Sequence, residues 1–434
     1  MDITILGGGL SALSLAYYLQ DSDNIDKIYI IEKENRLGGL CRSYKLNNIC
    51  YDIGPHIIFS KDKEVLEEMK SLLSNNCHMK RRSNQIIHKK RFVQYPFEND
   101  LSKLPPDDLN YAVNSFINNP YENYKALNME QFFLKTFGEG ITNLYLRPYN
   151  EKIWKFAPCC MNTKMVDRIP KPPYEDIIRS SKGETVDGYL HQLYFYYPDN
   201  GGMEELVKSY VNKFNNKIEV ICGANIRDVK KKDNSFMVML DDKVITSSKL
   251  VSTIPIDIFS NLYSKTPKRV RKNASNLRYN SIMIVMIQVN KDLCGDNFAF
   301  YVADSNIIFH RISKVDFLGD NYSDGNNTTY MAEITYRKND IYDKMSDKDV
   351  IVKVIEGLGR INFMDDDTKV IDSSVKRFDY AYVIYDVDYD KNVSSVRKYY
   401  LKEDIYLHGR FGNFEYINMD AVIRNSIDLA KRIK

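Results

Sequence analysis

The chain lacks several features that would place it in other classes of protein. No apolar run reaches the roughly 18 residues that a membrane-spanning helix requires, and the first residues are typical of a core strand rather than a signal peptide. The six histidines are scattered singly, and the seven cysteines show no C-x-x-C pair or other metal-binding spacing. We therefore expect no membrane span and no metal site.

The chain also has little excess of positive over negative charge. The formal net charge is only +3, so the composition gives no electrostatic reason to expect binding to nucleic acid. The odd number of cysteines and the absence of a secretion signal favour reduced thiols and a cytoplasmic location. The composition leaves the oligomeric state open, a homodimer included.

The most informative segment is the first one. A short apolar strand with Ile3 and Ile5 runs directly into Gly7-x-Gly9-x-x-Ala12, and a helical pattern of apolar residues follows. Glycines at this spacing permit a tight turn and let the backbone approach a pyrophosphate, which then lies on the free amides of the helix N-terminus. The segment predicts a dinucleotide-binding βαβ unit, with a βαβ unit that binds no ligand as the alternative.

Glu32 lies near the end of the next predicted strand, residues 27–33, 20 residues after Ala12. An acid at this place accepts hydrogen bonds from an adenosine ribose and repels a 2′-phosphate, so it favours NAD or FAD over NADP. The run E-K-x-x-R-L-G-G over residues 32–39 resembles the second fingerprint of FAD proteins of the amine oxidase type. A second glycine pair lets more backbone approach an extended ligand, and a guanidinium can bind phosphate through two donors.

The rest of the chain interleaves helical and strand patterns. Helical patterns dominate residues 61–195, strand patterns occur near 217–251 and 281–336, and an amphipathic helix is predicted from about Met419. We predict an α/β protein in which a Rossmann-type FAD-binding domain carries inserted helical and antiparallel β-sheet substrate domains. The predicted boundaries are 1–75, 196–275 and 370–434 for the discontinuous FAD-binding domain, 76–195 for the mainly helical domain and 276–369 for the β-sheet domain.

Four segments that span nearly the whole chain carry further motifs. Residues 51–57 read YDIGPHI, residues 147–154 read RPYNEKIW, residues 168–170 read RIP, and residues 409–420 read GRFGNFEYINMD. In this order they resemble the G-x-H-x-F, Y-x-x-K-Q-W, R-[IL]-P and G-R-L-G-x-Y-x-Y-x-D-M-D segments of the UDP-galactopyranose mutase family. This family lies within the wider amine oxidase and protoporphyrinogen oxidase-like flavoproteins.

The resemblance implies an unusual reaction for a flavoprotein. Family members contract a nucleotide-linked hexopyranose to the furanose with no net oxidation, and their FAD must be reduced. The flavin N5 attacks the anomeric carbon, the nucleoside diphosphate leaves, and the adduct opens and recloses through another hydroxyl. The resemblance therefore implies a nucleotide-sugar substrate, UDP-linked as in the family. The sequence itself leaves the base, the sugar and the electron donor open, with NADH or NADPH as one candidate donor.

The resemblance also assigns roles to individual residues. A diphosphate leaving group favours guanidinium groups held on rigid elements, which indicates Arg168 and Arg311 as catalytic residues. His56 is the third, expected to hydrogen-bond near the flavin ring. The alternatives are surface ion pairs for the arginines and a satisfied core position for the histidine. The expected substrate-binding residues are Tyr149, Trp154, Tyr382, Tyr385, Tyr416 and Asn418, with no choice made between Tyr382 and Tyr385 and with a buried Trp–Tyr core pair as the alternative for Tyr149 and Trp154.

The expected cofactor residues come from the glycine motifs and, by resemblance, from the C-terminal segment. Gly409 and Arg410 should approach the FAD pyrophosphate, and the helix that starts near Met419 should face the electron-rich edge of the flavin. Val220 or Ile221 should pack near the adenine by analogy with related folds, and Val220 is taken for the set below. The complete expected set is Gly7, Gly9, Ala12, Glu32, Lys33, Arg36, Gly38, Gly39, Val220, Gly409, Arg410 and Met419.

The chain departs from the family pattern at several positions. The mutases carry a second histidine after G-x-H-x-F, where this chain has Phe59 and Ser60, and an acid where it has Asn418. Residues 195–202 look more like the protoporphyrinogen oxidase and desaturase relatives. These departures keep a second hypothesis open, an FAD-dependent oxidoreductase of the protoporphyrinogen oxidase, amine oxidase or desaturase type.

Overall fold

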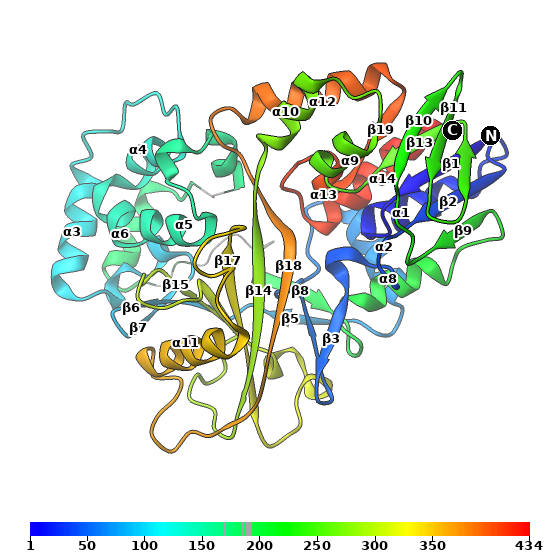
Figure 1. Ribbon diagram of the computed structural model, residues 1–434. Helices are drawn as coiled ribbons and strands as arrows, with labels where there is room; N and C mark the ends of the chain where they lie inside the picture. The colour runs from blue at the N-terminus through cyan, green and yellow to red at the C-terminus, as the bar shows by residue number, and fades with distance from the viewer. Residues whose placement is uncertain (169–170, 185, 187–192) are drawn as a thin grey trace.

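The computed structural model describes residues 1–168, 171–184, 186 and 193–434, with only the backbone described at Asp167 and Arg168. A parallel sheet with flanking helices lies on one side of the molecule and a group of helices lies on the other, as Figure 1 shows. A large sheet with two long strands lies between and below them (Figure 1). The functional residues come from all of these parts.

The parallel sheet is the Rossmann-type core. Its strand order is β19-β13-β1-β2-β9, and all its pairs are parallel. Ile3, Ile5 and Leu6 are fully buried, because helices cover one face of the sheet and a three-stranded antiparallel meander packs against the other. The strands are β1 (Asp2–Leu6), β2 (Lys27–Ile31), β9 (Ile218–Ile221), β13 (Lys249–Ser252) and β19 (Ile405–Leu407), and the helices beside them include α1 (Leu10–Leu19), α2 (Lys63–Leu73), α8 (Glu204–Val211), α13 (Gly409–Gly412) and α14 (Met419–Ile433).

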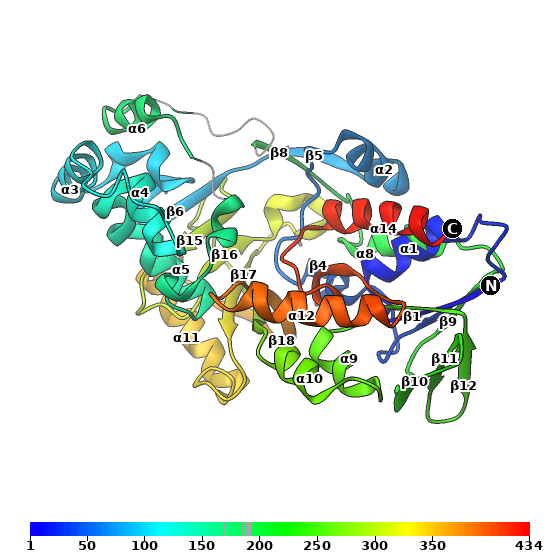
Figure 2. The same ribbon diagram turned by 90° about the horizontal axis from the view of Figure 1, so that it is seen from above.

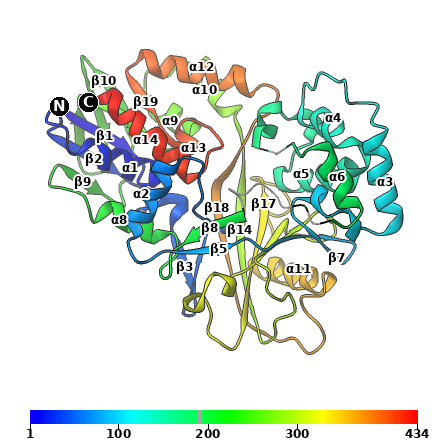
Figure 3. The same cartoon turned by 180° about the vertical axis from the view of Figure 1, so that it is seen from behind.

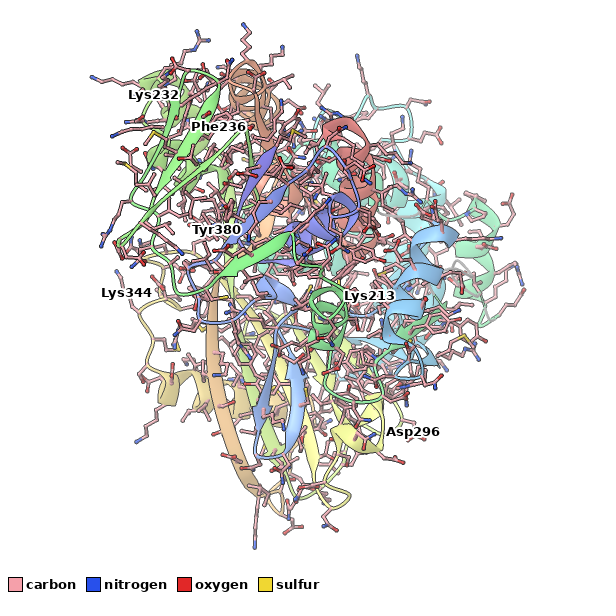
Figure 4. All side chains as sticks on the ribbon, turned by 90° about the vertical axis from the view of Figure 1, so that its right-hand side faces the viewer. Lys213, Lys232, Phe236, Asp296, Lys344 and Tyr380 are labelled. Carbon is pink, nitrogen blue, oxygen red and sulfur yellow. The ribbon has the colours of Figure 1, made fainter. Side chains whose placement is uncertain are left out.

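The chain leaves this sheet repeatedly and returns to it. After β9 it forms an antiparallel three-stranded meander, on which Lys232 and Phe236 lie at one end of the molecule (Figure 4). The basic run 230–232 therefore belongs to a hairpin at the periphery. The meander consists of β10 (Asp228–Lys232), β11 (Ser235–Met239) and β12 (Val244–Ser247), and the helices that follow β13 are α9 (Ile256–Leu262), α10 (Lys268–Ser275) and, before β19, α12 (Tyr389–Lys402).

The large sheet has the order β18-β14-β17-β16-β15-β6-β7. Its pairs are antiparallel except for β15 and β6, which run parallel. Both faces of β14 are buried: Ile282 and Ile284 face the core shared with the Rossmann region, whereas Met283 and Val285 face the core shared with α11 (Asp347–Arg360). The strands are β6 (Asn84–His88), β7 (Arg91–Gln94), β14 (Arg278–Val289), β15 (Ala299–Val302), β16 (Arg311–Lys314), β17 (Thr328–Tyr336) and β18 (Val370–Ile384).

The sheet draws strands from outside the segment 276–369 that was expected to form it. Segment 76–195, expected to be mainly helical, contributes β6 and β7, and segment 370–434, expected to join the FAD-binding domain, contributes β18. Each of these strands pairs with residues distant in the chain, such as Ile86 with Tyr301. Local periodicity carries no information about such partners.

The helices on the far side form a separate group, at the left of Figure 2. A left-handed Gly138, at φ 72°, kinks α4 against α3, where an added Cβ would lie 2.4 Å from the Ser115 carbonyl oxygen. Of two short two-stranded ribbons, the one formed by β5 and β8 runs between this side and the Rossmann side (Figure 3), whereas the one formed by β3 and β4 lies beside β18 of the large sheet. The helices are α3 (Pro106–Ile117), α4 (Met129–Ile141), α5 (Arg147–Trp154) and α6 (Tyr174–Ser181), and the ribbons are β3 (Ser43–Leu46) with β4 (Ile49–Asp52) and β5 (His78–Arg81) with β8 (Tyr194–Tyr197).

Within the described residues, none of the helices combines the length and apolarity needed to cross a membrane. In the same part of the chain, histidine, cysteine and carboxylate side chains do not gather in any group that could hold a metal ion.

A buried polar contact joins the first and last helices of the Rossmann region. The hydroxyls of Ser14 in α1 and Ser426 in α14 lie 2.7 Å apart, and His408 Nε2 lies 2.8 Å from the Ser426 Oγ. Burial lowers the pKa of His408 to about 4. The imidazole is therefore neutral in the folded protein near neutral pH.

His408 should make the fold less stable in mild acid. The folded-state pKa of His408 lies below the ordinary value near 6.5. The contribution of His408 to the free energy of unfolding is therefore complete above about pH 6.5 and is lost as the pH falls toward 4. The full effect is roughly 3 kcal/mol. His408→Gln should flatten this part of the unfolding free energy measured by urea titration between pH 7 and 4. His78→Gln, at a partly exposed histidine, is the matched control, and an unchanged slope in His408→Gln would contradict the assignment.

Candidate cofactor and substrate site

The first glycine loop contains one glycine that the fold requires and one that it does not. Gly7 has φ 95°, and an added Cβ would lie 2.5 Å from Thr253 Oγ1. Gly9 has an ordinary φ of −80°, and the nearest atom to an added Cβ is the Gly39 Cα at 3.9 Å. The protein therefore tolerates a side chain at Gly9, and the bare backbone there suits a ligand that approaches the start of α1.

Glu32 lies beside this loop, as the spacing predicted. Its Oε2 accepts a hydrogen bond from the Gly8 N–H at 2.6 Å, and its Oε1 accepts one from the Glu34 N–H at 2.9 Å. The carboxylate is buried at the end of β2. It therefore stands where a ribose bound along the loop would meet it.

Three glycine segments meet at the N-terminus of α1. The Gly38 N–H donates to the Gly8 carbonyl at 2.8 Å, and an added Cβ at Gly39 would lie 3.1 Å from the Gly9 Cα. Gly409, at φ 81°, approaches from the other end of the chain, and its added Cβ would lie 2.1 Å from Ser11 Oγ. With the buried Ala12 on α1, these segments leave little but backbone around the helix start, which fits an extended dinucleotide.

The other expected cofactor residues, Lys33, Arg36 and Val220, have different surroundings from one another. Lys33 is exposed beside Glu34, whereas the Arg36 guanidinium lies 4.5 Å from the ring centroid of Tyr44 and 3.5 Å from the Glu204 carboxylate. Val220 lies on β9 opposite Ile30 of β2. Arg36 is thus occupied by protein contacts, and Val220 lies on the strand next to the one that ends at Glu32.

Arg410 connects the cofactor residues to a small cavity. Its guanidinium donates to the Ile417 carbonyl at 2.6 and 2.9 Å and to the Ala381 carbonyl at 3.2 Å, and it lies over the Tyr416 ring. Met419 starts α14 immediately after Asn418. The cavity has a volume of about 230 Å³, and its wall includes His56, Arg82, Arg311, Arg410, Asn418 and Met419.

His56 is neutral in this cavity. Burial lowers its pKa to about 3, and the nearby positive charges of Arg410 and Arg311 act in the same direction. Its buried Nδ1 has no hydrogen-bond partner among the described residues. Near neutral pH the imidazole therefore carries no positive charge. Its Nδ1 can form a hydrogen bond with a bound ring as a neutral donor or acceptor.

Arg311 is held by a carboxylate of the protein. Its Nε and Nη2 donate to the two oxygens of Glu333 at 2.5 and 2.7 Å, and Glu333 is fully buried. This two-donor geometry leaves Nη1 outside the pair. Arg311 is thus a rigidly positioned donor whose charge is largely compensated, rather than a free cation.

Two aromatic groups lie next to this pair. Tyr145 and Tyr149 stack at 5.3 Å, Tyr149 meets the edge of Tyr301 at 5.8 Å, and Tyr301 stacks on Tyr95 at 4.7 Å. The Arg311 guanidinium lies 5.9 Å from the Tyr301 ring centroid. Stacked and edge-to-face rings of this kind form rigid walls that can also receive a planar base.

The second aromatic group contains one of the two expected tyrosines, and the other lies beside it. Trp154, Tyr382 and Tyr416 form a triangle with centroid separations of 5.6 to 5.9 Å. The hydroxyl of Tyr385 instead accepts a hydrogen bond from the Tyr416 N–H at 2.7 Å, and its ring packs on Tyr389. Tyr382 therefore packs within this triangle, whereas Tyr385 holds the Tyr416 backbone. The expected role of each in substrate binding stays a prediction.

Arg168 lies outside the residues whose side chains are described. Its backbone ends a short 3₁₀ segment, Thr163–Arg168. Its expected role as a catalytic arginine stays a prediction.

Sequence reasoning missed Arg82, Tyr301 and Glu333. Glu333 carried a signal, because it is a lone carboxylate within the apolar run of β17. Arg82 belongs to a run of basic residues, K-R-R over 80–82, that is typical of a solvated surface. Only the pairing of β6 with β15 brings Arg82 and Tyr301 to one cavity.

These features define the chain as a Rossmann-type dinucleotide-binding α/β protein. The model of the NAD(P)-binding Rossmann-like domain family matches residues 5–72. The chain is 22% identical to UDP-galactopyranose mutase of Mycoplasma genitalium over 304 residues, which cover 67% of this chain and 71% of that protein.

The whole chain has the fold of UDP-galactopyranose mutase. The crystal structure of a reduced UDP-galactopyranose mutase matches with a TM-score of 0.91 and 21% identity, covering 100% of this chain and 95% of the other. A putative protoporphyrinogen oxidase from Exiguobacterium matches with a TM-score of 0.77 and 15% identity, covering 100% and 98%. The predicted α/β fold class and the resemblance to this family are thereby confirmed.

Gly9→Ala tests the dinucleotide site. The protein has room for the methyl group, so the free energy of unfolding of the ligand-free protein should stay unchanged, while a bound pyrophosphate would be displaced. We expect flavin content, measured by absorbance after release, to fall at least about tenfold. Gly359→Ala, with nothing within 4 Å of the added Cβ, is the matched control. Full flavin content in Gly9→Ala would remove Gly9 from the site.

Arg311→Met tests the buried ion pair. Removing the guanidinium leaves the Glu333 carboxylate buried without its partner, which should cost about 3–5 kcal/mol in urea unfolding. The double variant Arg311→Met/Glu333→Gln removes both charges and should recover most of that loss. Equal stability of the single and double variants would mean that the pair is not formed in solution.

Proposed function

We propose that the protein is an FAD-dependent mutase that converts a nucleotide-linked pyranose to the furanose. The observation that carries this proposal is the cavity in which His56, Arg311 and Arg410 meet Asn418 and Met419 at the start of α14. It adjoins the glycine segments that suit a dinucleotide. The two similar proteins, the crystal structure that shares the fold and the relative from Mycoplasma genitalium, are both UDP-galactopyranose mutases and support the same reaction.

The residues present fit FAD. The bare backbone at Gly9 and Gly39 would receive the pyrophosphate, and Glu32 would accept from the adenosine ribose. The start of α14 would face the flavin, where the helix dipole favours a negatively charged ring. When bound and reduced, FAD supplies the nucleophile that sugar ring contraction with no net redox change requires.

The protein's own side chains would hold and orient the substrate. Arg311 Nη1 and Arg168 would donate to the diphosphate as it gathers charge, because guanidinium groups bind phosphate oxygens strongly. The Tyr382 and Tyr416 hydroxyls, at the ring triangle with Trp154, would orient the same group. A UDP-linked hexose is the substrate that the relatives favour.

A specific comparison supports a second candidate. The putative protoporphyrinogen oxidase shares the fold, and an FAD-dependent oxidoreductase would use the same dinucleotide site. The wall of the cavity argues against an apolar substrate, because it holds the guanidinium groups of Arg82, Arg311 and Arg410. We therefore favour the mutase.

Other features belong to the proposal as predictions. They are the reduced state of the active FAD, its reduction by NADH or NADPH, a homodimeric assembly and a cytoplasmic location. The reduced state is required by the proposed chemistry, because only the reduced flavin supplies the nucleophile. The electron donor, the assembly and the location are separate predictions on which the chemistry of the cavity does not depend.

Product analysis with reduced enzyme tests the proposal. Dithionite-reduced protein incubated without oxygen with UDP-galactose and related nucleotide sugars should produce a furanose isomer detectable by chromatography and NMR. Oxidised protein is the control and should give none. Oxygen-dependent turnover of another substrate, with no isomerised sugar from the reduced protein, would establish the oxidoreductase instead.

A further inference from the structure

Arg82 differs from the other arginines of the cavity. Nε and Nη2 are buried and have no hydrogen-bond partner among the described residues. The guanidinium lies over the ring of Phe59 at 4.4 Å, and its backbone N–H donates to the Leu193 carbonyl at 2.7 Å. A buried donor left without an acceptor is unfavourable, so this side chain needs an explanation.

The neighbouring arginines show what a satisfied guanidinium looks like here. Arg311 is paired with Glu333 through two hydrogen bonds, and Arg410 donates to the backbone carbonyls of Ile417 and Ala381. Arg82 has neither kind of partner within the described residues. Its donors are therefore available to an acceptor that the protein does not provide.

Arg82 stands where two cavities meet. It follows β5 and precedes β6, at the crossing from the Rossmann side to the large sheet seen in Figures 2 and 3. A larger cavity of about 700 Å³ and the smaller cavity of about 230 Å³ both include Arg82 and Asn84 in their walls. A ligand that extends from one cavity into the other passes the Arg82 guanidinium.

The ring beneath Arg82 is one of the positions at which the chain departs from the family pattern. Phe59 and Ser60 stand where the mutases carry a second histidine. An aromatic face supports a guanidinium by cation–π attraction while leaving its N–H donors free. In this chain Phe59 therefore supports the Arg82 guanidinium without occupying its donors.

We propose that Arg82 is an anion-binding, specificity-determining residue. This inference rests on the mutase proposal. Arg82 donates its Nε–H and Nη2–H to an anionic group of the bound nucleotide sugar at the junction of the cavities. Both a diphosphate and a carboxylate on the sugar present the paired oxygens that a planar guanidinium binds through two donors. The substrate therefore carries an anionic group at this junction, and the experiment separates its two sources.

The test uses the FAD-loaded full chain and measures binding of UDP, UDP-galactose and UDP-glucuronate by calorimetry. Arg82→Met should weaken binding about tenfold to a hundredfold, the loss typical of a hydrogen bond to a charged group. Arg82→Lys keeps the charge but not the planar pair of donors and should lose less. Arg91→Met, an exposed arginine on the adjoining strand, is the matched control.

The pattern across ligands identifies the anion. Equal weakening for all three ligands assigns Arg82 to the diphosphate, and weakening for UDP-glucuronate alone assigns it to a sugar carboxylate. If Arg82→Met binds every ligand as Arg91→Met does, the inference is overturned while the mutase proposal stands. If the wild-type protein binds none of them, the mutase proposal itself fails, and this inference fails with it.

Folding of the variants provides a second readout. Arg82 has no hydrogen-bonded partner to lose at Nε and Nη2, so Arg82→Met should melt at the wild-type temperature or above without ligand. It should then show a smaller ligand-induced rise in melting temperature. A large fall in ligand-free stability with unchanged ligand affinity in Arg82→Lys would make Arg82 a structural residue and overturn the inference.

Discussion

The close approach of bare backbone at the N-terminus of α1 is the constraint on which the rest of the site depends. Gly7–Gly9, Gly38–Gly39 and Gly409 converge there from three distant parts of the chain. Unpaired amides and the helix dipole make this point attractive to phosphate. Because Gly409 follows β19, the last strand of the parallel sheet, this surface is complete only when the whole sheet has formed.

Charge compensation decides what the adjoining cavity can bind. Arg311 is balanced by the buried Glu333, and Arg410 is satisfied by backbone carbonyls, so neither contributes a fully free cation. Both nevertheless lower the pKa of His56, in the same direction as burial. The result is a neutral imidazole among guanidinium donors, in surroundings where electrostatic interactions are weakly screened. Arg82 is the exception, with buried donors that no described residue satisfies.

The local parts of the structure follow the sequence closely. The strand, turn and helix of residues 1–19, the acid at Glu32 and the helix beginning at Met419 lie where their patterns predicted. Each depends on nearest-neighbour chemistry: glycine conformations, apolar periodicity and the alternation of buried residues. The membership of the large sheet could not be predicted in this way, because β6, β7 and β18 join it through partners far away in the chain.

The amino-acid sequence by itself determined the glycine-rich βαβ unit and part of the wall of the cavity, His56, Arg410 and Met419 among it, since short motifs encode both. Only the tertiary structure decided which side chains are satisfied and which are not. It paired Arg311 with Glu333, packed Tyr382 against Trp154 and Tyr416, and left the donors of Arg82 without a described partner at the meeting of two cavities. Hydrogen-bond partners depend on contacts between distant segments, and these exist only once the sheets and helices have packed together.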